Sequence, residues 1–298
     1  MISFEKPGAK GFKTPLKPIA AMAYFLLPIT EIRHALGSER VKMITIRKAE
    51  ERRHIEGKSQ QTWMTFDSEN QTDPLKNGFG VLKILNEEIL APGTGFVLHT
   101  HKDMVIVTYV REGMIVYKGP LGKIDILETK DFHAANVASD GKQYTFDASP
   151  NEDAHIFQSG FTPRKGALKK EGVKKLFTYA DRKGILRLIA SPDGRNSSLA
   201  IEQDVQIYST FINKGNHMIH ELSPGRDAWL HVVKGHILLN DLNLYTGDGA
   251  GLAMELSASF TAQEPTEILL FDLCKPIPDE VILIPSNGST AHPLLKAV

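Results

Sequence analysis

Cysteine is almost absent from this sequence of 298 residues, which contains Cys274 alone. A single cysteine can form no disulfide within the chain and excludes a cysteine-rich zinc site. A reducing compartment is therefore favoured, and we expect the cytoplasm. Cys274 ends the apolar run Ile268–Leu273, so we expect a packed, inert thiol. Redox sensing through this thiol is the alternative.

An excess of charge of either sign is also absent. Lys+Arg and Asp+Glu both number 35, so the formal net charge is zero. A balanced surface provides no electrostatic attraction toward nucleic acid or an anionic membrane. We therefore do not expect the bulk of the protein to bind nucleic acid.

Long hydrophobic runs are missing as well. The longest, Ile19–Ile29, is shorter than the roughly 20 residues that a membrane span needs. No small-x-small cleavage site follows it, so a signal peptide is not favoured. Residues 1–42 are lysine-rich without a clear period. We expect them to lie outside the folded unit, as a poorly packed arm or as an upstream reading of the gene that is not translated.

What the sequence does contain is a succession of short strand-like segments joined by polar, glycine-rich turns. Such spacing predicts a β-sandwich or a β-barrel. Two helices are expected as well, over 50–58 and over 165–179. The predicted strands fall into two series, 43–47, 80–85, 95–101, 105–111, 114–118, 124–127 and 143–146, then 199–201, 205–212, 218–222, 228–233, 236–240, 250–253, 257–262 and 268–273.

The two series share an internal repeat. Val105–Gly113 and Ala228–Gly235 both read as a strand, a basic residue and a glycine turn. A repeat of this size predicts two barrels related by duplication. When Gly113 is superposed on Gly235, Glu221 and Ser223 fall where the first copy has His99 and His101. We therefore expect a metal site in the first barrel only.

His99 and His101 are the candidate metal ligands. Two histidines at i and i+2 on a strand point to the same face, so one metal ion can take both imidazoles. Five residues separate Gly93 from His99, and the apolar run Val105–Val110 follows His101 in the sequence. This arrangement is the metal-binding pattern of the cupin barrel.

Seven short motifs carry a family resemblance: Asn86–Gly95, His99–Met104, Val107–Val110, Phe146–Pro150, Ala190–Gly194, Pro224–Arg226 and Gly247–Gly249. Taken together, they resemble the pirin family of two-barrel cupins, over about residues 43–274. The resemblance implies iron or a similar divalent ion in the N-terminal barrel. It also implies that some bacterial relatives act as quercetinases, oxygenases that open flavonols, and that eukaryotic relatives act as nuclear transcription cofactors.

The sequence departs from that family at the metal site. The family holds its metal with three histidines and one glutamate, of which the first two match His99 and His101. Anchoring on Phe146–Ser149 puts Gln143 at the third histidine and Thr145 at the glutamate. Gln143 offers a neutral carbonyl oxygen and Thr145 a weakly ligating hydroxyl, so the site is expected to bind metal weakly.

His133 is a candidate replacement for the missing imidazole. If residues 131–134 and 142–145 formed a hairpin, His133 would lie opposite Gln143 on the same face. A slip of one residue would turn it outward. Gln143, Thr145 and His133 are thus the predicted replacement ligands or cavity-lining residues.

We therefore predict an all-β fold of two cupin barrels in tandem. Residues 43–163 form the N-terminal barrel, 164–190 a partly helical linker, 191–274 the C-terminal barrel and 275–298 an extended tail. One prediction is a non-catalytic or weakly active binding or regulatory protein with an eroded metal centre, whose partner is a small aromatic molecule or a protein. The alternative is a metal-dependent dioxygenase of quercetinase type acting on a flavonol-like aromatic. The cofactor is one divalent metal ion, iron favoured, or none, and no membrane association is expected.

Overall fold

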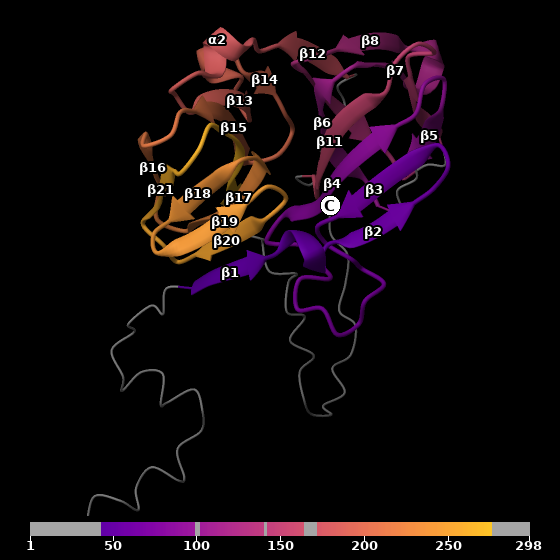
Figure 1. Cartoon of the computed structure of the whole chain (residues 1–298). Helices are drawn as coiled ribbons and strands as arrows, with labels where there is room; N and C mark the ends of the chain where they lie inside the picture. Colours follow the sequence, from indigo (N-terminus) through magenta and orange to yellow (C-terminus); the bar gives the residue numbers. More distant parts are fainter. Residues whose placement is uncertain (1–42, 99–101, 140–141, 164–171, 276–298) are drawn as a thin grey trace, which may run out of the picture. The chain divides into compact units, whose positions relative to one another are not determined.

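The computed structural model describes residues 43–98, 102–139, 142–163 and 172–275. The described chain is nearly all β-structure, as the sequence predicts, and forms two barrels, each made of a large and a small sheet (Figure 1). No helix among the described residues is long and apolar enough to cross a membrane. His99 and His101 lie outside the described residues.

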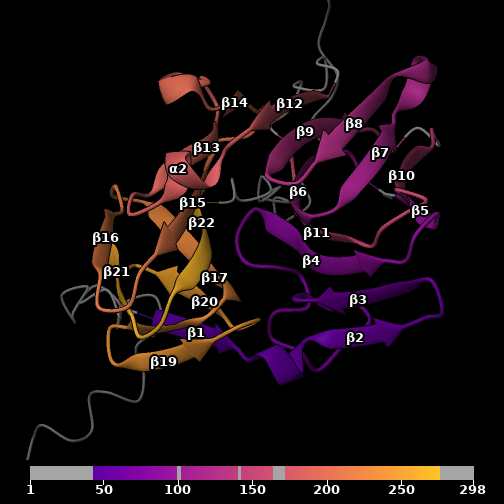
Figure 2. The same cartoon turned by 45° about the horizontal axis from the view of Figure 1, so that its top comes forward.

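The first barrel has a seven-stranded and a four-stranded sheet (Figure 2). The large sheet has the order β12-β9-β6-β11-β4-β3-β2, with β12 at Val173–Leu176, β9 at Asp131–Val137, β6 at Met104–Glu112, β11 at Ala154–Phe161, β4 at Leu82–Leu90, β3 at Gln60–Met64 and β2 at Arg53–Glu56. The small sheet has the order β5-β10-β7-β8, with β5 at Gly95–Leu98, β10 at Tyr144–Ala148, β7 at Met114–Lys118 and β8 at Ile124–Glu128.

The second barrel repeats this plan. Its large sheet has the order β1-β20-β17-β22-β15-β13-β14, with β1 at Met43–Arg47, β20 at Gly249–Ala253, β17 at Arg226–Lys234, β22 at Thr266–Cys274, β15 at Val205–Ile212, β13 at Arg187–Ser191 and β14 at Leu199–Ala200. Its small sheet has the order β16-β21-β18-β19, with β16 at His217–Glu221, β21 at Ser257–Ala262, β18 at His236–Leu239 and β19 at Leu242–Tyr245. The helical elements are η1 at Ala49–Glu51, η2 at Pro120–Gly122, α2 at Tyr179–Arg182 and η3 at Arg195–Ser197.

Alternation along the strands gives each large sheet two apolar faces. In β6, Ile106 and Val110 face the interior of the first barrel, whereas Val107 and Tyr109 face the second barrel. A strand buried on both faces reads as a continuous apolar run, and Met104–Val110 is buried throughout.

The two barrels pack through the outer faces of their large sheets. One hydrophobic cluster spans this seam and includes Phe157 and Phe161 of the first barrel and Trp229 and Phe271 of the second. The Phe161 and Phe271 ring centroids are 6.1 Å apart. Each barrel also has a separate interior cluster, so the seam is a third core.

The predicted strands overlap observed strands, with the end of 95–101 lying outside the described residues. Both predicted helices are wrong where the structure describes them. Residues 50–58 contain the end of η1 and all of β2, and 173–176 form β12; the only α-helix described is α2. Three of the four positions in each of β2 and β12 are exposed, so these two edge strands carry little apolar period and are not predicted.

Two strands lie in a sheet that their place in the chain does not suggest. β1 opens the range predicted as the first barrel, yet it pairs with β20 of the second. β12 lies in the predicted linker, yet it pairs with β9 of the first barrel. Strand β1 thus belongs to the second barrel and strand β12 to the first.

The repeated glycine turn is built alike in both barrels. Gly113 and Gly235 have φ values of 78° and 104°, which favour glycine. A Cβ on Gly113 would lie 2.1 Å from the carbonyl oxygen of Asp153, and one on Gly235 would lie 2.4 Å from Oγ1 of Thr266.

Gly113→Ala is expected to destabilise the protein by about 3 kcal/mol or more, because it adds a backbone clash to an unfavourable φ. Gly215→Ala is the matched control, since Gly215 has φ 82° but no atom within 4 Å of its Cβ position. That variant should lose only about 1 kcal/mol. Urea unfolding of both variants measures the difference, and equal losses would contradict the steric explanation.

Candidate functional site

A row of polar side chains crosses the inner wall of the first barrel. Asn86 of β4 lies opposite Gln158 of β11, Gln158 opposite Thr108 of β6, and Thr108 opposite His133 of β9. Their neighbours Ile106, Ala135 and Ile156 belong to the interior cluster, so alternation directs this row inward. Gln158 Nε2 donates to Thr108 Oγ1 over 3.3 Å.

Glu88 adds a carboxyl group to the same wall. It is 3% exposed, and burial raises its pKa to about 8. A hydrogen bond from Asn86 opposes this shift only in part. The Glu88 carboxyl is therefore protonated and neutral at pH 7.

His133 is fully buried on this wall. Burial lowers its pKa to about 4, although Asp125 opposes the shift with a carboxylate oxygen 3.5 Å from His133 Nε2. The Tyr117 ring lies 4.4 Å from the imidazole. Neither ring nitrogen makes a hydrogen bond among the described residues. His133 is thus a neutral imidazole at pH 7.

Aromatic rings from the small sheet face this polar row. Phe146 of β10 stacks on Phe96 with centroids 5.2 Å apart and contacts Tyr117 at 5.3 Å. Tyr144 is 2% exposed and accepts a hydrogen bond at its hydroxyl from the amide of Ala138. The strand β10 therefore fills the barrel interior with Tyr144 and Phe146.

This orientation decides where the other predicted site residues lie. Thr145 stands between two inward-facing aromatic residues and pairs with Val97 and Lys118, which are both exposed, so it belongs to the outer face of β10. Gln143 precedes β10 and is exposed. Neither residue lines the barrel interior.

The predicted hairpin between residues 131–134 and 142–145 is wrong. β9 pairs with β6 and β12, whereas β10 pairs with β5 and β7 in the other sheet. His133 therefore lies opposite Thr108 and Lys174, not Gln143. The prediction assumed that two strands adjacent in sequence pair, but β9 belongs to the large sheet and β10 to the small one.

The described residues contain no group of three or more His, Cys, Asp or Glu side chains arranged to hold a metal ion. Cys274 is half-buried, with its Sγ 3.9 Å from Oε1 of Gln203. Its thiol therefore donates to the side-chain amide oxygen of Gln203.

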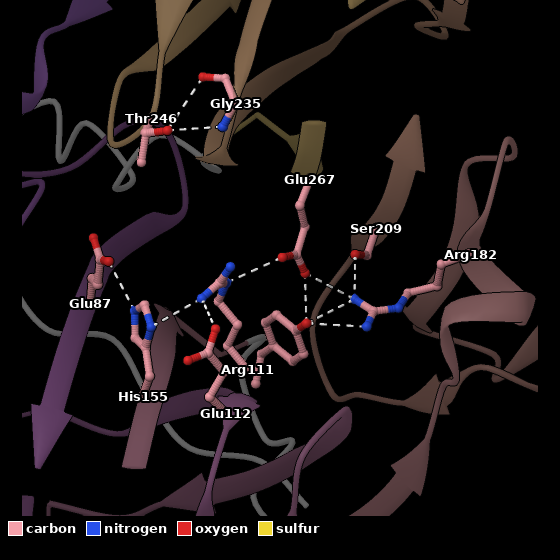
Figure 3. Close-up of polar contacts among 10 residues, drawn as sticks. Glu87, Arg111, Glu112, His155, Arg182, Ser209, Gly235, Thr246 and Glu267 are labelled. Carbon is pink, nitrogen blue, oxygen red and sulfur yellow. Dashed lines mark hydrogen bonds and ion pairs between the residues drawn. The ribbon is translucent and has the colours of Figure 1, made fainter. Parts of the chain in front are cut away.

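A second polar cluster lies between the barrels and has no counterpart in the sequence prediction (Figure 3). Tyr109 donates to Glu267 Oε1 over 2.6 Å, and Arg182 donates to the Tyr109 hydroxyl over 3.1 Å and to Ser209 over 3.0 Å. Arg182 is fully buried and lies 3.3 Å from Glu267. We call this set the seam network; it comprises Glu87, His155, Arg111, Glu267, Tyr109, Arg182 and Ser209.

The other end of the seam network is centred on His155. Its Nε2 lies 2.9 Å from Glu87 Oε1, and its Nδ1 lies 3.4 Å from an Arg111 nitrogen (Figure 3). Burial alone would raise the pKa of Glu87, but His155 and Arg52 lower it to about 2. His231 lies beside this group, and burial lowers its pKa to about 3.

The sequence offered a weak signal for these residues. Arg111, Tyr109 and His155 were visible as polar residues within apolar strands, and such residues are usually hydrogen-bonded when buried. Their partners Glu267 and Arg182 lie far away in the chain, so no local pattern connects them.

These observations define a tandem cupin protein, in which two duplicated β-barrels pack through their large sheets. The Pirin family model matches residues 46–159, and the model for the quercetinase C-terminal cupin domain matches residues 188–273. The chain belongs to the pirin family.

Relatives of known structure and name agree with this assignment. Quercetin 2,3-dioxygenase from Escherichia coli K12 is 31% identical over 231 residues, which cover 78% of this chain and 99% of that protein. Pirin-like protein YhaK from the same organism is 27% identical over 251 residues, covering 78% of this chain and 99% of that protein. The crystal structure of the bacterial pirin YhhW from Escherichia coli in complex with nickel(II) superposes with a TM-score of 0.71 at 31% identity, covering 79% of this chain and all of that one.

Glu88 and Glu87 predict opposite responses of stability to pH. Because the pKa of Glu88 rises from 4.5 to about 8 on folding, the folded state binds the extra proton, and this contribution to stability is lost as the pH rises from 4.5 through 8. Glu88→Gln should remove that loss. The free energy of unfolding of the variant, taken relative to that of the wild type, should therefore be higher at pH 8 than at pH 5.

Glu87→Gln is the control for this prediction. The pKa of Glu87 falls from 4.5 to about 2, so its contribution is present above pH 4.5 and lost as the pH falls toward 2. Urea unfolding at several pH values measures both variants. A Glu88→Gln variant with the pH dependence of the wild type would contradict a buried neutral carboxyl.

Breaking the seam network should be costly. Glu267→Ala leaves the fully buried Arg182 without its carboxylate, and losses of this kind are about 3–5 kcal/mol. Glu112→Ala is the matched control: it removes a partner of Arg111 whose side chain is 64% exposed, and it should cost less than about 0.5 kcal/mol. Chemical unfolding distinguishes the two, and similar losses would contradict a stabilising role for the buried pair.

Proposed function

We propose that this member of the pirin family is a non-catalytic or weakly active binding or regulatory protein whose metal centre is eroded. The observation that carries the proposal is the orientation of β10. Tyr144 and Phe146 occupy the barrel interior, while Gln143 and Thr145, at the positions of the family's third histidine and glutamate, lie outside it.

The residues at these two positions do not fit a four-ligand metal site. A mononuclear oxygenase centre uses imidazoles and usually a carboxylate, with open positions for substrate and dioxygen. An exposed amide supplies neither group to the interior. The Thr145 hydroxyl lies on the opposite face of β10 from Tyr144 and Phe146, where its oxygen is buried without a hydrogen-bond partner among the described residues. With His99 and His101 as the remaining candidate ligands, affinity should fall by more than the 10–100-fold typical of losing an outer-shell partner.

The charge of the inner wall supports the same proposal. Burial keeps Glu88 protonated and His133 neutral at pH 7, so the wall offers hydrogen-bonding groups without net charge. With Glu88 protonated, the wall lacks the carboxylate that an oxygenase centre usually uses. Our proposed partners are a small aromatic molecule or a protein, and the proposed compartment is the cytoplasm.

The second candidate function is a metal-dependent dioxygenase of quercetinase type. It is favoured by the 31% identity to a relative named quercetin 2,3-dioxygenase and by the nickel(II) bound in a related pirin structure. This function requires that His99 and His101 hold a metal ion, iron favoured, together with further ligands from elsewhere in the chain.

Metal content separates the two candidates. Protein purified without chelator or a metal-binding tag should contain far less than one equivalent of iron, nickel, manganese or copper, including after iron loading. Oxygen uptake with quercetin should remain at background. One equivalent of metal with quercetin-dependent oxygen uptake would overturn the proposal in favour of the dioxygenase.

The double variant Gln143→His/Thr145→Glu tests the orientation of β10. Because both side chains lie outside the barrel, restoring the family's ligand types should leave metal content unchanged. If the variant gained one equivalent of metal, metal binding would be limited by residue type alone and not by the orientation of the strand.

A further inference from the structure

The seam between the barrels is closely packed at its centre and open at one edge. Around Tyr109 and Phe157 the remaining space is about 10 Å³, roughly one water molecule. At the edge, between β9 of the first barrel and residues 198–202 of the second, a cavity of about 280 Å³ remains. We call it the seam cavity.

The wall of the seam cavity is apolar and comes from both barrels. Val105 and Ala134 of the first barrel face Leu199 and Ile201 of the second, and each is at most 6% exposed in the protein. Ala134 and Ala200 contribute short side chains to the lining, and larger residues at these positions would occupy the space. Close packing elsewhere in the same seam means that the opening is specific to this edge.

One side of the cavity is polar. Asn136 Nδ2 donates to Glu202 Oε2 across 3.2 Å, which joins the first barrel to the second. Both residues line the cavity. A carboxylate has about four acceptor sites, so Glu202 can accept from an occupant while it retains Asn136 and its other interactions. The cavity therefore combines an apolar body with an acceptor at one side.

We propose that the seam cavity binds a small, largely apolar ring compound that carries one hydrogen-bond donor. The volume lies just below the roughly 300–1,000 Å³ of drug-sized pockets, which restricts the occupant to one or two fused rings. Apolar walls with few polar groups are typical of such pockets. An anionic compound is disfavoured by Glu202.

Binding at this position stabilises the contact between the barrels, since both contribute to the wall. This inference deepens the proposed binding function, but the site is separate from the interior of the first barrel. A metal centre in that barrel would neither create nor remove the seam cavity.

Indole is a suitable probe, and indene, which has nearly the same shape but no N–H donor, is its control. Calorimetric titration of the full chain with indole should show one site, and indole should raise the melting temperature. Indene should bind about fivefold more weakly, as expected for one lost hydrogen bond.

Two variants fill the cavity independently. Ala134→Leu and Ala200→Leu should each weaken indole binding by at least about tenfold, because the added side chain occupies the space of the ring. Ala180→Leu is the matched control, since Ala180 is exposed on α2 and does not line the cavity. Cooperative thermal unfolding of each variant verifies that it is folded.

Absence of indole binding, or binding that neither folded cavity variant weakens, would overturn the seam site. Loss of indole binding in His99→Ala would place the probe in the first barrel and would also overturn it. A third outcome is one equivalent of metal with quercetin-dependent oxygen uptake, combined with indole binding that Ala200→Leu abolishes. This outcome would overturn the proposed function but not the seam site. The two proposals therefore fail separately.

Discussion

The packing of the two large sheets against each other is the constraint on which the rest of the structure depends. Each barrel has its own interior core, but the outer faces of β6, β11, β17 and β22 are apolar and must be covered. Trp229, fully buried, fills much of this seam. The seam network then satisfies buried charges within it, because an unpaired Arg182 would carry a large desolvation penalty.

The same constraint maintains the fold that the first barrel shares with bacterial pirins of about 31% sequence identity. The strands and turns are maintained by the seam and by glycine turns such as Gly113. The barrel interior is free to change as long as it stays filled, and Tyr144, Phe146 and the polar row of Asn86, Gln158 and Thr108 fill it.

Much of the fold was predictable because strand periodicity is local. Alternation and glycine turns predicted most strands of both barrels, and the repeat around Gly113 and Gly235 predicted the duplication. The edge strands β2 and β12 were not predicted, because exposed edges carry little apolar pattern. Strands β3, β11, β13 and β19 were not among the predicted strands either. The pairing of β1 with β20 was not predicted either, because it joins segments about as far apart as the folded chain allows.

The candidate site depended far more on tertiary structure. By itself the sequence determined the family and the substitutions Gln143 and Thr145 at expected ligand positions. It could not determine which face of β10 points inward, because a shift of one residue exchanges the two faces. Nor could it place His133 opposite Thr108, or bring Glu267 to Arg182, since these contacts arise only when two sheets and two barrels close. Local patterns therefore predicted most of the strands, and long-range packing decided which residues each side chain contacts.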